Sequence, residues 1–141
     1  MYIANRARAQ HLILPPPRGG TETILLAEDD EAVRKLIRTI LDRFGYTVIE
    51  AVDGEDAIIR FKENSDKIDL LILDVIMPKK DGKMAYEEIK KVRSEIKAIF
   101  ASGYTTDIID RKGILEEGVN LIQKPISPND LLRKVREVLD K

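Results

Sequence analysis

Acidic, hydroxyl and basic side chains stand at the ends of four separate apolar runs of this sequence. They are Glu28, Asp29, Asp30, Asp74, Ser102 and Lys124. Carboxylates held close together repel each other, by about 4 kcal/mol for two unit charges at ~4 Å and an effective dielectric constant near 20. A hard divalent cation such as Mg²⁺ relieves that repulsion and keeps waters that a phosphate can displace. Asp74 would then stay ionised and nucleophilic, and a phosphoryl group would fit between the ion, the Lys124 amine and the Ser102 hydroxyl.

Each of these residues also has an ordinary structural interpretation. Acidic residues before a helix usually cap it. Asp74 is followed by Pro78 and by Asp81 and Gly82, a composition typical of turns. A single lysine is most often a solvated surface residue. Only the combination, with each group at the end of a different run, favours a functional site.

The apolar runs are short and regularly interrupted. They cover residues 24–27, 47–49, 70–73, 98–101 and 119–122. Three of them are almost wholly apolar, as expected of parallel strands covered on both faces. Between these runs, and after the last one, apolar residues recur at helical spacing. These segments cover about 33–44, 54–61, 84–92, 106–115 and 128–139. Gly45 should end the first helix, and Asp53 and Ser127 should cap the second and the last.

Strict alternation of five strands and five helices predicts an α/β fold. The expected architecture is a doubly wound (βα)5 three-layer sandwich of the flavodoxin-like type, with a parallel sheet in the order 2-1-3-4-5. Ligands of such sheets bind beyond the carboxyl ends of the strands. The polar groups after the strands should therefore converge at one edge.

Composition limits the remaining classes of function. The chain has 141 residues and a net charge of −1, which suits one domain without a global field for nucleic acid. It has no cysteine, one histidine and no apolar run near the ~18 residues of a membrane span. Residues 1–22, with Pro15–Pro17 and two glycines, are expected to be a flexible linker or the tail of an upstream domain, and residues 23–141 the domain itself. A short strand at 12–14 is the alternative for the leader.

Four segments resemble the receiver domain of bacterial two-component response regulators. They are ILLAEDDEAVRKL (24–36), LLILDVIMPKKDG (70–82), IFASGY (99–104) and QKPISPNDLL (123–132). The resemblance covers roughly residues 23–140. It implies a phosphoacceptor domain that takes a phosphoryl group from a histidine kinase, changes conformation, and catalyses only its own transfer and slow dephosphorylation. It is thus expected not to be an enzyme in the usual sense.

The resemblance also assigns a metal site. Glu28 and Asp29 match the acidic pair that binds Mg²⁺, for which Mn²⁺ can substitute. Asp74 matches the phosphoacceptor, and the backbone carbonyl of Ile76 matches the main-chain metal ligand. The first acidic position holds Glu28 where Asp is common, and the longer side chain should still reach the ion.

Two further positions are matched to phosphoryl binding and switching. Ser102 matches the hydroxyl residue that repositions on activation, and Lys124 matches the family's lysine, whose bond to Pro125 is cis in such domains. The switch position three residues before the lysine, usually Tyr or Phe, is Leu121. An aromatic switch cannot operate with this side chain.

The expected partner is a histidine kinase or a phosphotransfer domain. The leader and the sequence GGTETILLAEDD resemble the junction of hybrid sensor kinases, so the kinase can belong to the same parent chain. Because the sequence ends just after the last predicted helix, we expect a stand-alone receiver or one taken from a hybrid kinase, and not a transcription factor. The expected location is cytoplasmic, with no direct nucleic acid binding and no membrane insertion, and the resemblance allows a homodimer. It does not identify the kinase, the target or the signal.

Three other functions remain open from the residues alone. A phosphorylation-independent interaction module would keep the fold without the chemistry. A Mg²⁺-dependent phosphatase with an aspartyl nucleophile would need a second aspartate where Ile76 stands. A flavin-binding domain of the same strand order would need hydroxyl and backbone donors where the acidic run 28–30 would repel a phosphate.

Overall fold

Five parallel strands form one sheet in the computed structural model, which describes residues 17–103 and 120–141. The strands are β1 (Thr23–Ala27), β2 (Thr47–Ala51), β3 (Leu70–Asp74), β4 (Lys97–Ser102) and β5 (Asn120–Gln123). Their order is β2-β1-β3-β4-β5, as predicted. The strand order reverses between β1 and β3, and this is the switch point at which ligands of such sheets bind.

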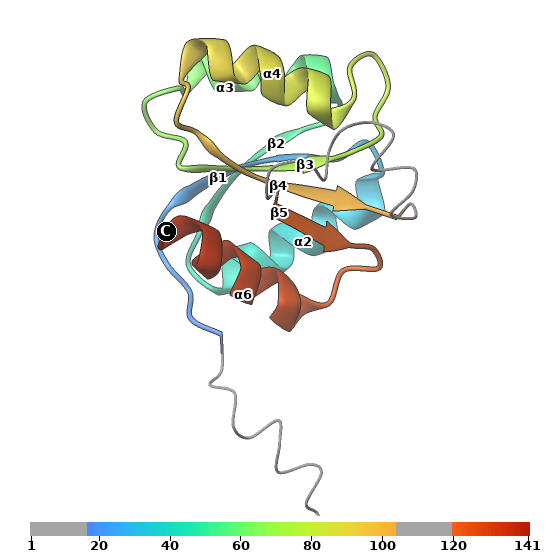
Figure 1. Ribbon diagram of the computed structural model, residues 1–141. Coiled ribbons are helices and arrows are strands. Elements are labelled where there is room, and N and C mark those ends of the chain that lie inside the picture. Colours follow the sequence, from blue (N-terminus) through green and yellow to red (C-terminus); the bar gives the residue numbers. More distant parts are fainter. Residues whose placement is uncertain (1–16, 104–119) are drawn as a thin grey trace, which may run out of the picture.

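Four described helices complete the three layers (Figure 1). They are α2 (Glu31–Arg43), α3 (Gly54–Glu63), α4 (Gly82–Val92) and α6 (Pro128–Leu139). Figure 1 shows α3 and α4 over one face of the sheet and α2 and α6 over the other. Each face has its own buried apolar cluster, and β3 contributes to both because successive side chains of a strand point to opposite faces. The fifth predicted helix, at 106–115, lies outside the described residues.

Every described helix begins with a side chain that accepts a hydrogen bond from the first turn. The caps are Asp30, Asp53, Asp81 and Ser127. Such a cap satisfies one of the four backbone N–H groups that a helix start leaves without a partner. Gly45 lies just beyond α2 with a φ of 98°, a conformation that disfavours other residues. The predicted caps Asp53 and Ser127 and the predicted stop at Gly45 are confirmed.

Several apolar residues at helical spacing are not buried. Leu36 on α2, and Met84 and Val92 on α4, have about half of their surface exposed. A helix buries only the side chains that lie directly over the sheet, so residues at the margin of an apolar stripe remain at the surface. The spacing therefore predicted the helices correctly without defining the width of the buried face.

An irregular segment precedes β1 and lies against the opposite end of the domain from the predicted site. Its Gly20 N–H donates to the Phe44 carbonyl at 3.1 Å, and its Glu22 pairs with Arg136 of α6. These contacts fall within the predicted linker 1–22, of which the structure describes residues 17–22. The remaining leader, with its alternative strand at 12–14, lies outside the described residues. In the part of the chain that is described, no helix combines the length and apolar character needed to pass through a bilayer.

Candidate functional site

The strand register places the predicted functional segments side by side. Ala27, the last residue of β1, is opposite Leu73 of β3. Asp74, the next residue of β3, is opposite Ala101, which is followed by Ser102. Ser102 is in turn opposite Gln123, the residue before Lys124. The structure thus confirms that these segments meet at the carboxyl edge of the sheet.

Three carboxylates converge at this edge. Each of Glu28, Asp29 and Asp74 offers one oxygen, and these oxygens all lie within 4.8 Å of one another. Glu28 is 1% exposed and Asp74 is 7% exposed, whereas Asp29 faces solvent. Burial strengthens the repulsion between the carboxylates because little water is present to screen it.

Lys124 is the cation that faces the two buried carboxylates. Its Nζ lies 2.8 Å from Glu28 Oε1 and 3.2 Å from Asp74 Oδ2. Burial lowers the lysine pKa, but the contacts with Glu28 and Asp74 outweigh it, so the pKa of Lys124 is raised overall. The amine is therefore protonated at neutral pH.

One lysine does not neutralise the cluster. Burial, and then the negative charge of Glu28, raise the pKa of Asp74 to about 7, and the contact with Lys124 only partly opposes them. An aspartate ordinarily titrates near 3.8. The described residues of the site therefore hold more negative charge than Lys124 compensates, and this favours the binding of a cation.

The donor set fits a hard cation such as Mg²⁺. Glu28 Oε1 is buried and accepts no hydrogen bond in the described structure, and its close contact there is the ion pair with Lys124. The other oxygen, Oε2, accepts from the Asp30 N–H at 3.0 Å. Carboxylate oxygens gathered in this way are the ligands that Mg²⁺ prefers. Ile76, the predicted main-chain ligand, is partly buried two residues beyond Asp74, and the role of its carbonyl stays a prediction.

Ser102 and Lys124 are fixed to each other through their backbones. The Lys124 N–H donates to the Ser102 carbonyl at 2.8 Å, and the predicted cis bond between Lys124 and Pro125 is present. Ser102 is 2% exposed. Leu121, at the predicted switch position, is partly buried and packs against the apolar cluster beneath α3 and α4. Its role in switching stays a prediction.

Not every acidic residue near the edge belongs to the cluster. Asp30 accepts from the Val33 N–H and Asp81 accepts from the Met84 N–H, so the ordinary capping interpretation holds for both. Sequence reasoning missed Arg34, whose guanidinium contacts the backbone of Glu28. Its place one turn into the helix that follows the acidic pair is the signal that could have identified it.

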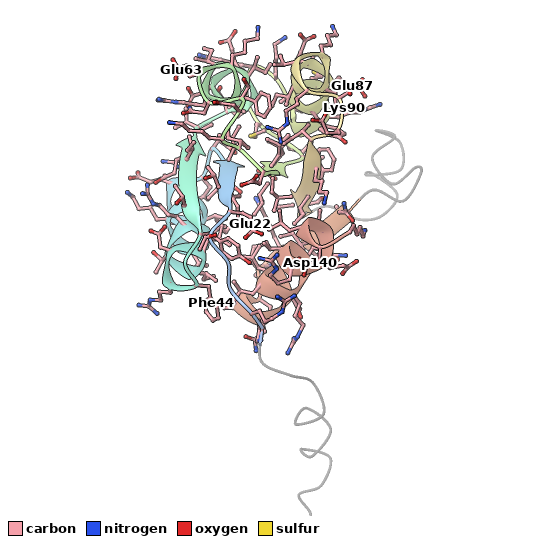
Figure 2. All side chains as sticks on the ribbon, turned by 90° about the vertical axis from the view of Figure 1, so that its left-hand side faces the viewer. Glu22, Phe44, Glu63, Glu87, Lys90 and Asp140 are labelled. Atoms are coloured by element: carbon pink, nitrogen blue, oxygen red, sulfur yellow. The ribbon has the colours of Figure 1, made fainter. Side chains whose placement is uncertain are left out.

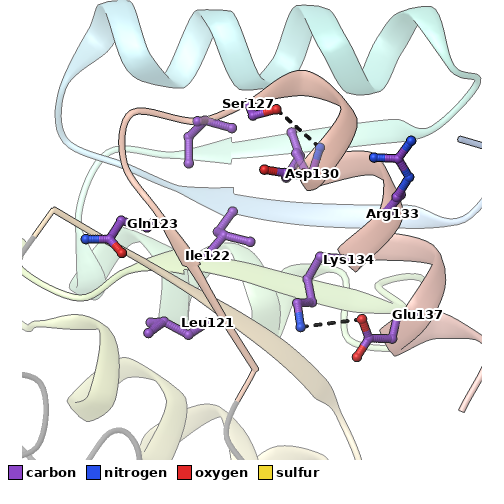
Figure 3. Close-up of a pocket in the computed structure, with 10 residues that line it drawn as sticks. Leu121, Ile122, Gln123, Ser127, Asp130, Arg133, Lys134 and Glu137 are labelled. Atoms are coloured by element: carbon purple, nitrogen blue, oxygen red, sulfur yellow. Dashed lines mark hydrogen bonds and ion pairs between the residues drawn. The ribbon is translucent and has the colours of Figure 1, made fainter. Parts of the chain in front are cut away.

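A pocket of about 320 Å³ lies between β5 and α6 (Figure 3). Leu121 and Ile122 line it on the strand side, and Lys134 and Glu137 line it on the helix side, where they pair at 3.4 Å. None of the three clustered carboxylates is among its lining residues. This pocket is therefore separate from the chemistry at the carboxyl edge.

The fold is thus a doubly wound domain with a cluster of three carboxylates at its switch point. The chain belongs to the response regulator receiver domain family, whose sequence profile matches residues 24–136. It is thus a receiver domain of the kind found in two-component signalling.

Individual relatives agree with this assignment. The sensor kinase CckA of Brucella abortus (strain 2308) is 37% identical over 122 residues, which are 86% of this chain and 13% of that protein. The chemotaxis protein CheY of Treponema pallidum (strain Nichols) is 33% identical over 124 residues, covering 87% of this chain and 86% of that protein. This chain spans 48% of another relative, the probable transcriptional regulator ycf27 of Porphyridium aerugineum. Similarity to such longer proteins concerns their receiver segments.

Solved structures show the same fold. The receiver domain from the hybrid histidine kinase CckA superimposes with a TM-score of 0.71 at 38% identity, covering 83% of this chain and 98% of that one. A response regulator receiver domain protein from Clostridium thermocellum gives a TM-score of 0.76 at 27% identity, with 84% and 94% covered. The predicted flavodoxin-like sandwich is confirmed.

Proposed function

We propose that Asp74 accepts a phosphoryl group in a Mg²⁺-dependent step. The observation that carries this proposal is the carboxylate cluster with its two buried members, in which Lys124, the one facing lysine among the described residues, leaves negative charge uncompensated. Such a cluster is unfavourable as a purely structural feature, since burying like charges costs stability. The same arrangement would become favourable if the carboxylates bound a cation and the cation bound a phosphoryl group.

The expected donor is the phosphohistidine of a histidine kinase or phosphotransfer domain. One carboxylate oxygen of Asp74 attacks the phosphorus, an O–P bond forms, the N–P bond breaks, and the imidazole nitrogen keeps the electron pair. Mg²⁺ held by Glu28, Asp29, Asp74 and the Ile76 carbonyl would neutralise charge on the phosphoryl oxygens. The Lys124 ammonium would pair with another of these oxygens, and the Ser102 hydroxyl would donate to a third.

Phosphorylation would change the charge that this edge presents to its neighbours. A protein with two conformations shifts toward the one that binds the phosphoryl group better, and Ser102 is the group placed to sense it. Leu121 cannot offer a hydroxyl or ring to such a movement, so the output would involve apolar repacking. As a phosphoacceptor, the chain would not turn over a separate substrate. The cytoplasmic location and the pairing with a kinase in the same parent chain stay predictions.

The test is incubation with acetyl phosphate or beryllofluoride and MgCl₂, followed by mass spectrometry or NMR. The wild-type chain should gain one phosphoryl group, or the spectral change of its beryllofluoride analogue, only when Mg²⁺ is present. Asp74→Asn should abolish the gain, and Asp66→Asn, at an exposed position away from the cluster, should keep it.

Other outcomes would favour the alternative functions. A folded wild-type chain that shows no Asp74-dependent change would indicate a phosphorylation-independent interaction module. Steady hydrolysis of a phosphomonoester would indicate a phosphatase. A yellow protein with bound flavin would indicate a cofactor-binding domain.

A further inference from the structure

Arg34 of α2 reaches back to the residues after β1 that form the acidic pair. Its Nη1 donates to the Glu28 carbonyl oxygen at 2.8 Å, and its Nε donates to Glu50 Oε1 of β2 at 2.8 Å. The Arg34 side chain is only 11% exposed. A guanidinium that is this buried and engaged at two sites is held in one orientation.

The carbonyl that Arg34 binds belongs to the peptide group that joins Glu28 to Asp29. Both residues contribute a carboxylate to the cluster. Because this peptide group lies between their Cα atoms, the hydrogen bond from Arg34 restrains the backbone torsions ψ of Glu28 and φ of Asp29. The contact with Arg34 therefore acts on the geometry of both at once.

The other polar atoms of Glu28 are also engaged. Its N–H donates to the Ala51 carbonyl at 3.2 Å, and Oε2 accepts from the Asp30 N–H at 3.0 Å. Ala51 directly follows Glu50, so Arg34 and the backbone bond connect Glu28 to adjacent residues of β2. This closes a ring of contacts between the end of β1, the start of α2 and the end of β2.

Glu50 is itself fixed by a second arginine. Arg38, one turn further along α2, pairs with Glu50 Oε2. The hydrogen bond from Arg38, assisted by the one from Arg34, lowers the pKa of Glu50 against the opposing effect of burial. Glu50 thus remains charged and keeps Arg34 oriented, whereas Arg38 makes no described contact with the backbone of Glu28.

We propose that Arg34 is a positioning residue for the Mg²⁺ site: by holding the peptide group between Glu28 and Asp29, it sets the carboxylates in the geometry that the cation needs. The proposal rests on the proposed function, because it assigns Arg34 a role in the same site. Partners that orient metal ligands without touching the metal typically affect affinity by roughly 10–100-fold.

Titration calorimetry of the metal-free full chain with MgCl₂ tests the proposal. Arg34→Met should weaken Mg²⁺ binding by about tenfold or more. Arg34→Lys should restore part of the loss, because an ammonium can still donate to the Glu28 carbonyl but cannot engage Glu50 at the same time. The matched control is Arg38→Met, which also removes a Glu50 ion pair but leaves the Glu28 contact, and its Mg²⁺ affinity should stay within about twofold of wild type.

Urea unfolding of the same proteins separates positioning from stability. If Arg34→Met left the Mg²⁺ affinity unchanged, or if Arg38→Met weakened it equally, the positioning role would be wrong. Should Arg34→Met fail to fold, Glu50→Gln replaces it. That change removes the charge that orients Arg34, and an unaltered Mg²⁺ affinity in it would also overturn the proposal.

The wild-type titration tests the proposed function separately. A folded wild-type chain that neither binds Mg²⁺ nor accepts a phosphoryl group would disprove the proposed function and the role of Arg34 with it. A wild-type chain that does both, together with unaffected Arg34 variants, would disprove only the positioning role.

Discussion

The two edges of the sheet both gather carboxylates, but they compensate the charge differently. At the carboxyl edge, Glu28 and Asp74 are buried and share Lys124. At the amino edge, Glu22 before β1 and Asp140 after α6, both labelled in Figure 2, pair with Arg136. The comparison separates a charge cluster that stabilises the fold from one that is available for chemistry.

Balanced charge characterises the amino edge. Arg136 pairs with Glu22 at 2.9 Å and with Asp140 at 2.6 Å, and Arg18 adds a second cation to Asp140. The hydrogen bond from Arg136 lowers the pKa of Glu22, and the bonds from Arg136 and Arg18 lower the pKa of Asp140 to about 2. Folding therefore stabilises the ionised form of each carboxylate.

At the carboxyl edge the pKa shift has the opposite sign. The pKa of Asp74 rises to about 7 because burial and Glu28 outweigh the single lysine. The same chemical groups thus give a stabilising network where cations match anions and water is near. At the carboxyl edge, Lys124 is the described cation that pairs with the buried Glu28 and Asp74, and part of their negative charge is left uncompensated. A metal ion would supply the positive charge that this edge lacks.

Among these predictions, removing Lys124 should have the largest effect on the difference between the two edges. Lys124→Met leaves Glu28 and Asp74 buried without their facing cation, so we expect the metal-free protein to lose about 2–3 kcal/mol of unfolding free energy near pH 8. MgCl₂ should restore a large part of that loss, since a divalent ion would supply the missing charge. Urea unfolding with EDTA and with MgCl₂ measures both.

The control for Lys124→Met lies at the other edge. Arg136→Met also removes a cation, but its loss of stability relative to wild type should be the same with and without MgCl₂, because neither Glu22 nor Asp140 belongs to the carboxylate cluster. Equal losses with and without MgCl₂ for Lys124→Met would contradict a cation deficit at the carboxyl edge.

Gly82 offers a way to move the nucleophile without changing any charge. A Cβ added at Gly82 would lie 2.4 Å from the Asp74 carbonyl oxygen, so Gly82→Ala must displace backbone at the end of β3. We expect a loss of about 1–2 kcal/mol in urea unfolding. We also expect about tenfold slower phosphorylation by acetyl phosphate, because small displacements of a reacting group are costly.

Gly103→Ala is the matched change for Gly82→Ala. Among the described residues, the nearest atom to its added Cβ would be the Lys124 Cβ at 3.9 Å, which is an ordinary contact. Stability and phosphorylation rate should therefore stay near wild type. A Gly82→Ala protein with wild-type rate would show that the position of Asp74 tolerates this displacement.

Much of the fold and site followed from local patterns in the sequence. Apolar runs of three or four residues marked the strands, and Asp53, Ser127 and Gly45 marked helix ends, because these effects act within a few residues. Convergence of Asp74 and Lys124 followed from topology alone. The carboxyl ends of parallel strands share one edge, whatever the sequence distance between them.

Other features could not be predicted because they depend on side-chain contacts across the fold. Asp29 and Asp30 are adjacent and chemically alike, yet one joins the carboxylate cluster and the other caps α2. No periodicity separates them, since the difference arises from where each side chain points. The pairs of Arg34 with Glu50 and of Arg136 with Glu22 likewise join different elements, and only packing reveals which charged residues meet.

The smallest predicted effect concerns the pH dependence of the amino edge. Since the pKa values of Glu22 and Asp140 are lowered in the folded chain, their pairs with Arg136 stabilise it above the ordinary carboxyl pKa of 3.8–4.5 and cease to do so as the pH falls toward 2. Arg136→Met should cost about 1 kcal/mol at pH 7 through the Glu22 pair, and the difference from wild type should shrink between about pH 5 and pH 2. Urea unfolding over that range measures it.

Arg133→Met, on the same helix but contacting neither carboxylate in the described structure, should follow the wild-type profile. A difference between Arg136→Met and wild type that stayed constant down to pH 2 would mean that Arg136 stabilises the edge by packing instead of by charge.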